Sequence, residues 1–273
     1  MRSLTLTALL TASALALTAC GTDASDSTAD ASAPLRVGVS PVPHAEILQF
    51  VDDELAADAG LDLELVEFTD YVQPNVALDD GSLDANYFQH EPYLAEQESA
   101  AGYDFEAVTA VHLEPLGLYS ETVTDVADLP DGAQIAIPND PTNGARALQL
   151  LVDQGLITLA DTGDASATVL DVEDNPKKLE FAEIEAAQLP RSLADVDAAV
   201  INGNYAIEAD LSPAQDAIAA ESPEDNPYAN LLVVRTGDEN DERVAILAEL
   251  LASDEVATFI EETYAGTVVS ARS

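Results

Sequence analysis

The chain has 273 residues, of which 52 are acidic and 9 are basic, and its formal net charge is −43. A field this negative excludes nucleic acid as a partner, because phosphates would be repelled. A single cysteine excludes an internal disulfide, and the roughly 240 residues after the N-terminal segment are enough for two lobes.

The first 20 residues have the pattern of a secretory signal. Met1-Arg2 is a short positive start, residues 4–17 are apolar, and LTAC follows, ending at Cys20. The apolar run is too short to span a membrane comfortably. Because Cys20 follows a Leu-x-Ala triplet, it resembles the lipobox cysteine of bacterial lipoproteins. We predict a signal peptide at 1–20, lipid on Cys20, and a flexible tether at 21–34, which has no large apolar side chain.

From residue 35 onward the apolar pattern alternates between the period of strands and that of helices. Strands or extended segments are expected at 35–39, 61–68, 83–90, 107–120, 133–138, 167–172, 198–201 and 229–235. Helices are expected at 44–59, 73–80, 91–101, 143–154, 177–187, 191–194 and 241–264. This order predicts an α/β fold with parallel strands.

The expected organisation is a discontinuous first lobe, 35–118 with 236–273, and a second lobe, 119–235. The candidates for the strands that cross between lobes are the long extended segments 108–120 and 230–236. Ligands of such folds bind where lobes meet, at the carboxyl ends of strands and the N-termini of helices.

Arg146 is the most informative single residue. The sequence PNDPTNGAR places it in the first turn of the predicted helix, which Thr142 or Asn143 is expected to cap. A helix N-terminus carries a partial positive charge, so an arginine there is unfavourable unless an anion lies opposite both. A small carboxylate ligand is one candidate anion. The alternative is an ion pair with a nearby acid, such as Asp140 or Asp153.

Four motifs carry a resemblance to a known family. They are DANYFQHEPY at 84–93, HLEPLGLYS at 112–120, the stretch at 138–146, and NPYANLLVV at 226–234. Together they resemble the NlpA family, the methionine-binding lipoproteins of ABC importers, from the lipobox to near the C-terminus. The resemblance implies a type II-like periplasmic-binding-protein fold with two α/β lobes and two crossover strands. It also implies a lipid-anchored protein on the extracytoplasmic face of the cell membrane, with an ABC permease and its ATPase as partners.

The resemblance implies a free amino acid as ligand, with L-methionine expected first and D-methionine or a related amino acid as alternatives. Arg146 resembles the family's arginine that grips the α-carboxylate. Asn202 and Asn230 resemble the asparagines that hold the carboxylate and the α-amino group, and Asn143 is predicted to bind ligand with them. A neutral amide both donates and accepts, which suits a zwitterion. Without the family pattern, Asn202 reads as a turn after a strand and Asn230 as a strand start.

The methionine thioether requires a different lining. Alternation on the strand at 83–90 predicts two faces, one with Asn86, Phe88 and His90 and the other with Tyr87 and Gln89. Tyr71 and Tyr93 are predicted to complete an aromatic box with Phe88 and His90, because sulfur packs favourably against aromatic edges. The alternative is that these aromatics belong to the core.

A divalent metal, zinc or manganese, is the main alternative ligand. The candidate ligand side chains are His44, His90 and His112, with Glu46, Glu91 and Glu114 nearby. Against it, there is no His-rich loop, and a metal site has no use for Arg146. An enzyme is not expected, because the sequence contains no nucleophile elbow and no phosphate-binding glycine loop. No cofactor is expected. A purely structural lipoprotein is a further alternative, but it would not explain why Arg146 lies in the first turn of a helix.

Overall fold

The computed structural model describes residues 33–160 and 167–271. The expected signal peptide, Cys20 and most of the expected tether lie outside these ranges. Within them, no helix combines the length and the apolar character needed to cross a membrane.

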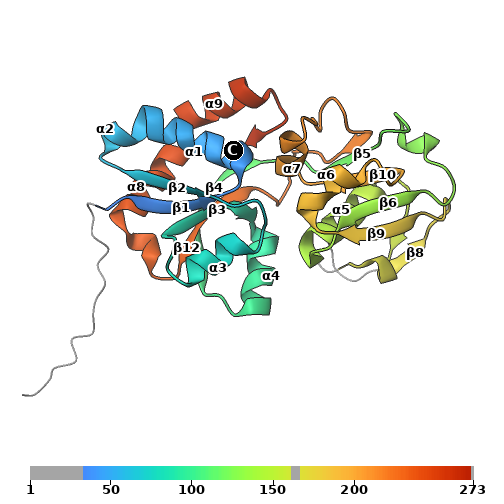
Figure 1. The fold of residues 1–273 in the computed structure, drawn as a ribbon, viewed down its shortest axis with the longest axis horizontal. Helices are drawn as coiled ribbons and strands as arrows, with labels where there is room; N and C mark the ends of the chain where they lie inside the picture. Colours follow the sequence, from blue (N-terminus) through green and yellow to red (C-terminus); the bar gives the residue numbers. More distant parts are fainter. Residues whose placement is uncertain (1–32, 161–166, 272–273) are drawn as a thin grey trace, which may run out of the picture. The chain divides into compact units, whose positions relative to one another are not determined.

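The described residues form two mixed sheets and a small strand pair (Figure 1). The first sheet has the spatial order β13 (Val269–Ser270), β4 (Phe105–Leu113), β12 (Asn230–Arg235), β3 (Ala85–His90), β1 (Leu35–Val39), β2 (Leu63–Glu67). The second sheet has the order β11 (Ala219–Ala220), β5 (Gly117–Tyr119), β10 (Ala198–Ile201), β6 (Gln134–Pro138), β9 (Glu180–Ile184). The remaining pair is β7 (Thr158–Leu159) and β8 (Val172–Asp174).

Helices cover both faces of each sheet. The α-helices are α1 (Glu46–Val51), α2 (Ala57–Ala59), α3 (Gln73–Asp79), α4 (Glu91–Ala101), α5 (Pro141–Asp153), α6 (Leu189–Ser192), α7 (Gly203–Glu208), α8 (Glu242–Leu251) and α9 (Asp254–Tyr264). Helical turns of other types are η1 (Pro41–Ala45), η2 (Asp52–Ala56), η3 (Val126–Asp128), η4 (Val169–Asp171), η5 (Ala186–Gln188) and η6 (Asp238–Asn240). These layers confirm the α/β class expected from the alternating sequence pattern.

The core of the first sheet explains why β3 is buried at every position and β1 at every position except Arg36. On one face, β1 packs with α1, α8 and α9 into a cluster that includes Val37, Ile47 and Leu247. On the other face, α3 and α4 contribute Leu78 and Leu94 to a second cluster, and Figure 1 shows these helices on that side. Both strands are therefore covered on their two faces, as central strands of such sheets are.

Two expected elements were wrong. Residues 177–187, expected to be helical, contain the strand β9, because 180–184 pair in parallel with β6 and this long-range ladder overrides the local helix propensity. Residues 167–172, expected to be a strand, form the turn η4, in which Thr168 and Asp171 cap each other.

The sheets are mixed, and not wholly parallel as expected. The chain passes from the first sheet to the second between β4 and β5, and returns between β11 and β12. After this return, β12 runs antiparallel to both β3 and β4. The sequence analysis assigned residues 230–235 to the second lobe, whereas the strand they form is hydrogen-bonded inside the six-stranded sheet.

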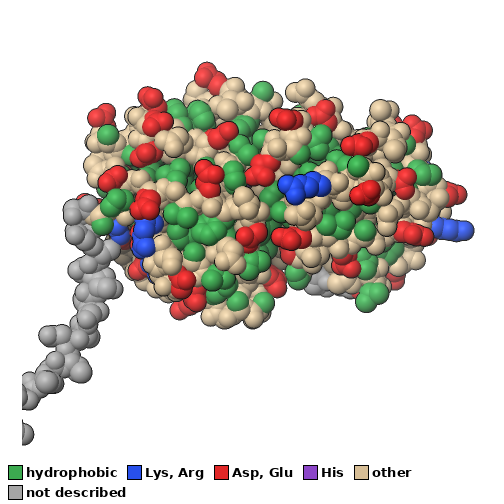
Figure 2. Space-filling view, viewed as in Figure 1, with side chains coloured by type: hydrophobic (Ala, Val, Ile, Leu, Met, Phe, Trp, Pro, Cys, Tyr) green, Lys and Arg blue, Asp and Glu red, His purple; other side chains and the backbone are tan. Residues whose placement is uncertain are grey.

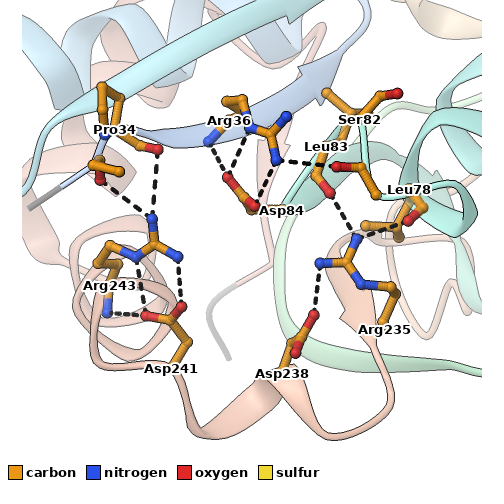
Figure 3. Close-up of polar contacts among 12 residues, drawn as sticks. Pro34, Arg36, Leu78, Ser82, Leu83, Asp84, Arg235, Asp238, Asp241 and Arg243 are labelled. Atoms are coloured by element: carbon orange, nitrogen blue, oxygen red, sulfur yellow. Dashed lines mark hydrogen bonds and ion pairs between the residues drawn. The ribbon is translucent and has the colours of Figure 1, made fainter. Parts of the chain in front are cut away.

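Acidic side chains are spread over the visible face of the molecule, with few basic ones among them (Figure 2). Three of the basic side chains, Arg36, Arg235 and Arg243, lie together near the start of β1 (Figure 3) and form what we term the arginine corner. Each is ion-paired with an aspartate, for example Arg36 with Asp84 at 3.0 Å. These cations therefore serve the fold itself.

Candidate functional site

A cavity lies at the carboxyl end of β3, the start of β12, and the N-terminal parts of α5 and α7. Its lining is His44, Tyr71, Phe88, Gln89, His90, Tyr93, Glu114, Asn143, Arg146, Asn202, Gly203, Asn204 and Asn230. The structure thus brings together all eight side chains predicted to bind ligand.

The helix α5 begins earlier than the sequence analysis expected. Asp140 is the N-cap, and its Oδ1 accepts hydrogen bonds from the backbone N–H of Asn143 at 2.9 Å and from the Thr142 hydroxyl at 3.0 Å. Pro141 is the first helical residue, a position where its fixed φ is favourable. Neither Thr142 nor Asn143 is therefore the cap, and Arg146 is the sixth residue of the helix, in its second turn and not in its first as expected.

Arg146 is 4% exposed and belongs to a buried ion pair. Its Nε donates to Glu221 Oε1 at 2.7 Å, and its Nη2 donates to Glu221 Oε2 at 2.6 Å and to the Glu114 backbone carbonyl at 3.0 Å. The guanidinium also stacks on the Tyr228 ring, 4.2 Å from its centroid. The internal partner is Glu221, and not Asp140 or Asp153. Nη1 takes part in none of these bonds, so it is the nitrogen that can serve a ligand in the cavity.

Asn143 joins three elements at the cavity. Its Oδ1 accepts from Asn202 Nδ2 at 2.8 Å and from His90 Nε2 at 3.2 Å. His90 Nδ1 in turn accepts from the backbone N–H of Tyr93 at 3.2 Å, which fixes the neutral tautomer with the proton on Nε2. Burial, followed by the charge of Arg146, lowers the pKa of His90 to about 3. His90 is thus a neutral donor at physiological pH.

Three polar atoms of the cavity wall are buried and have no hydrogen-bond partner within the described residues. They are His44 Nδ1, Asn202 Oδ1 and Asn204 Nδ2. A buried polar atom left unpaired costs roughly 1 to 3 kcal/mol, so each points to a group that completes it. An acceptor and a donor in one small cavity match a zwitterion.

An aromatic wall faces this polar side. The Tyr71 and Phe88 ring centroids are 6.1 Å apart, Tyr71 and Tyr93 are 6.0 Å apart, and Phe88 is 4% exposed. The arrangement offers edges and faces for a polarisable apolar group. The predicted aromatic box is therefore assembled in the structure, although its part in binding stays a prediction.

The predicted alternation along β3 is broken at Phe88. Leu231 of β12 pairs with Gln89 while Leu232 pairs with Tyr87, so the register skips Phe88 as a β-bulge. Bulges next to functional sites re-aim side chains. As a result Gln89, expected on the opposite face from Asn86, donates to Asn86 Oδ1 at 3.0 Å and also lines the cavity.

The histidines do not form the metal set that the sequence analysis considered. His44, His112 and Glu114 come within 4.8 Å of one another, but His90 binds Asn143 and is not part of this cluster. Glu46 accepts from Tyr264, and Glu91 is exposed. Of the six candidates, three are therefore separate from the cluster.

The His44–His112–Glu114 cluster is hydrogen-bonded internally and to Tyr87 and Asn230, and within the described residues only His44 Nδ1 of its ring nitrogens has no partner. His112 Nε2 lies 2.7 Å from Glu114 Oε1, and its Nδ1 contacts the Tyr87 hydroxyl. His44 Nε2 lies 3.0 Å from Asn230 Oδ1. Burial lowers the pKa of His44 to about 4 and that of His112 to about 3, and burial raises the pKa of Glu114. A neutral His44 therefore orients the Asn230 amide.

Sequence reasoning missed five further lining residues: Gln89, Gly203 and Asn204, together with His44 and Glu114, which it considered only as metal ligands. Gly203 has a detectable signal, because it follows Asn202 in the sequence INGN. A Cβ on Gly203 would lie 2.5 Å from the Glu114 Cβ, so only glycine allows this approach.

The sequence profile of the NlpA lipoprotein family matches residues 35–272. The D-methionine-binding lipoprotein MetQ of Escherichia coli (strain K12) is 42% identical over 257 residues, covering 93% of each chain. The methionine-binding lipoprotein MetQ of Bacillus subtilis (strain 168) is 40% identical over 274 residues, covering 98% of each chain.

Solved structures show the same fold. A nutrient-binding protein from Burkholderia cenocepacia bound to methionine has a TM-score of 0.84 and 47% identity, covering 87% of this chain and 100% of that chain. The lipoprotein Tp32 of Treponema pallidum has a TM-score of 0.83 and 43% identity, covering 87% of this chain and 99% of that chain. These likenesses confirm the binding-protein fold expected from the four motifs.

Proposed function

The chain belongs to the NlpA lipoprotein family, and on this premise we propose that it is the substrate-binding lipoprotein of an ABC importer and that its ligand is methionine. The relatives named above are binding proteins, so the chain is a transport component and not an enzyme. The observation that carries the proposal is the buried cavity, in which one cation, unpaired amide atoms and an aromatic wall lie together.

Each part of the cavity suits one part of methionine. We assign the carboxylate to Arg146 Nη1, since a guanidinium is a strong donor to carboxylates. Asn202 Oδ1, an unpaired acceptor, suits the ammonium group, and Asn230 is held by His44 to serve the same end of the ligand. The thioether would lie against Tyr71, Phe88 and Tyr93, where sulfur gains roughly 0.3 to 1.5 kcal/mol per aromatic contact.

Capture would proceed by closure of two lobes around the ligand. Strand pairing supports lobes that differ slightly from the expected ranges, with the six-stranded sheet in one and the five-stranded sheet in the other. Their walls already share hydrogen bonds, such as Tyr205 Oη to the Thr69 carbonyl at 3.3 Å. A ligand that touches both walls stabilises the closed arrangement.

The cellular setting is also part of the proposal. Lipid on Cys20 would anchor the protein at the extracytoplasmic face of the cell membrane, and residues 21–34 would serve as a tether. The partners would be a membrane permease with its ATPase. The family's lipoprotein name supports this setting.

The metal alternative is not supported. The relatives are named for methionine, and one solved relative is bound to it. In this chain, the cluster of two histidines and Glu114 is engaged by Tyr87, Asn230 and its own members.

Native mass spectrometry of the purified mature domain tests the function directly. We expect an adduct of methionine mass, and calorimetry on ligand-free protein should show stoichiometric binding of L-methionine, with D-methionine measured in parallel. Zinc and manganese serve as the controls and should give no heat. A metal-mass adduct, or saturable metal binding without methionine binding, would contradict the proposal.

A further inference from the structure

We propose that Asn204 donates a hydrogen bond to the ligand carboxylate and, through Tyr71, ties that contact to the opposite wall of the cavity. The inference rests on the proposed function, because it names a further residue of the same site. It is carried by one unpaired donor atom and by the contacts that fix its position.

The backbone of Asn204 is held in place before any ligand is considered. Asn204 is the second residue of α7 and is 2% exposed. The Glu114 carboxylate lies against this turn because residue 203 is a glycine, and the Asn204 backbone favours its charged form, which lowers the pKa of Glu114 against the effect of burial. Glu114 in turn is bonded to His112. Asn204 is therefore mounted on a buried, hydrogen-bonded support.

The side chain of Asn204 has one end paired and one end free. Its Oδ1 accepts from the Tyr71 hydroxyl at 2.6 Å, a distance typical of an O–H···O bond and short for an N–H···O bond. This assigns the oxygen to Tyr71 and leaves Nδ2 on the other side. Nδ2 is buried and has no hydrogen-bond partner within the described residues.

The chemistry of Nδ2 selects the ligand group. An amide nitrogen donates and does not accept, so it pairs with a carboxylate and not with an ammonium. Asn204 lines the same cavity as Arg146, whose Nη1 is also a donor. The two donors together supply the carboxylate with more bonds than the guanidinium alone, since Glu221 occupies its Nε and Nη2.

Tyr71 gives the contact its second role. It follows β2 of the six-stranded sheet, whereas Asn204 follows β10 of the five-stranded sheet. Burial raises the pKa of the Tyr71 hydroxyl well above 10, so the hydroxyl stays a donor. A carboxylate that polarises the Asn204 amide strengthens its bond from Tyr71, because neighbouring hydrogen bonds reinforce one another.

The test uses three variants and two ligands. Calorimetry compares Asn204→Ala, Asn204→Asp and Tyr71→Phe with the wild type, for L-methionine and for its methyl ester, which keeps the ammonium and thioether but carries no anionic carboxylate. For methionine, Asn204→Ala should lose roughly 10- to 100-fold in affinity, the range for a hydrogen bond to a charged group. For the ester, the same variant should lose about 3-fold or less, since the charge-assisted bond is absent.

Asn204→Asp tests whether residue 204 faces the negatively charged carboxylate of the ligand. Aspartate keeps the shape and the acceptor for Tyr71, but it places an anion against the carboxylate, so it should weaken methionine binding more than Asn204→Ala does. Tyr71→Phe should cost less than Asn204→Ala and should couple to it in a double-mutant cycle. Thermal unfolding of each ligand-free variant reports whether the fold is intact.

Three results would overturn the inference. They are an unchanged methionine affinity in Asn204→Ala, an equal loss for methionine and its ester, and a gain in affinity for Asn204→Asp. A wild type that binds neither ligand would instead refute the proposed function itself.

Discussion

Arg146 illustrates how a buried cation is kept available without being left unpaired. Removing a guanidinium from water is costly unless its charge is balanced, and Glu221 supplies the balance through two short bonds. The pair is neutral, and Nη1 remains for the ligand. A site built this way favours a zwitterion, which adds no net charge to the interior.

Arg146→Ala is expected to abolish methionine binding, because it removes the ligand's strong counter-charge. Arg146→Lys keeps the charge but loses the planar fork, so it should still lose roughly 10-fold or more. Glu221→Gln, the matched control, should weaken binding less than either change, since Arg146 keeps an amide partner. Calorimetry on the ligand-free variants measures all three. Near-normal affinity in Arg146→Ala would refute the role of this residue.

Phe88→Ala should weaken methionine far more than it weakens alanine, because only the longer ligand reaches the aromatic wall. The loss for methionine is expected at roughly 10- to 100-fold, corresponding to one buried aromatic contact surface. Competition binding against a fluorescent reporter gives both affinities. Equal losses for the two amino acids would mean that Phe88 serves the core alone.

At the residue scale, the sequence predicted the side chains whose signal is local. Arg146 stands out because basic residues are scarce, and Asn230 falls in one of the four family motifs, whereas Asn202 lies outside them and was assigned by its position in the resemblance. Asn204 has no such signal, because its meaning depends on an atom left unpaired in three dimensions. The same holds for Glu221, which is 75 positions from Arg146 in the chain.

At the scale of elements, the start of α5 decides where the site residues point. Asp140 caps the helix and also accepts from the Asn143 side chain at 3.0 Å. One carboxylate therefore fixes both the first turn and the amide that joins His90 to Asn202. Asp140 is therefore a structural residue whose loss we expect to affect binding.

Asp140→Ala is expected to destabilise the protein by about 1 kcal/mol, the usual cost of losing an N-cap. It should also weaken methionine binding several-fold, because Asn143 loses its anchor. Asp140→Ser is the control, since a serine hydroxyl still caps the helix. Urea unfolding and calorimetry together check the expectation, and an alanine variant as stable as the serine variant would contradict it.

Helices and strands that a local sequence pattern specifies were predicted well. Those that depend on pairing with a strand distant in the sequence were not. The helix 91–101 and the strands 35–39 and 198–201 match the structure residue for residue. β9 depends on pairing with β6, and the bulge at Phe88 depends on the register of β12. Neither partner is visible in a short window of sequence.

At the scale of the whole molecule, the buried histidines set the response to acid. His44, His90 and His112 are all neutral in the fold, with pKa values lowered to about 4, 3 and 3. In the unfolded chain their pKa is near 6.5. Between these values the unfolded state binds more protons, so stability falls as the pH drops below about 6.5. The raised pKa of Glu114 opposes this in part.

Urea unfolding at pH 6.5, 5.5 and 4.5 should therefore show a falling free energy of unfolding. The three histidines together contribute at most about 4 kcal/mol per pH unit to this slope. High salt in every sample screens the repulsion among the exposed acidic side chains, so that the histidines are compared against a constant background. His90→Gln should give a shallower slope than the wild type. A free energy that stays constant or rises on acidification would contradict the expectation.

The fold class and the two-sheet organisation were predictable, because alternating strands and helices leave few architectures. The sheet membership of β12 was not. Residues 230–235 come after the whole of the second sheet in the chain. Their pairing with β3 and β4 depends on tertiary contacts that a local sequence pattern does not encode. This pairing places Asn230 between His90 and His112 and so brings it to the site.

The arginine corner has a mechanical consequence. Arg243 of α8 donates to the Ala33 carbonyl at 3.2 Å, immediately before β1, and β1 is flanked by two parallel neighbours, β2 and β3. A pull that reaches Ala33 along the strand loads both ladders in shear, so many hydrogen bonds share the tension at once. If the proposed tether at 21–34 transmits a pull, the domain would resist unfolding from this end.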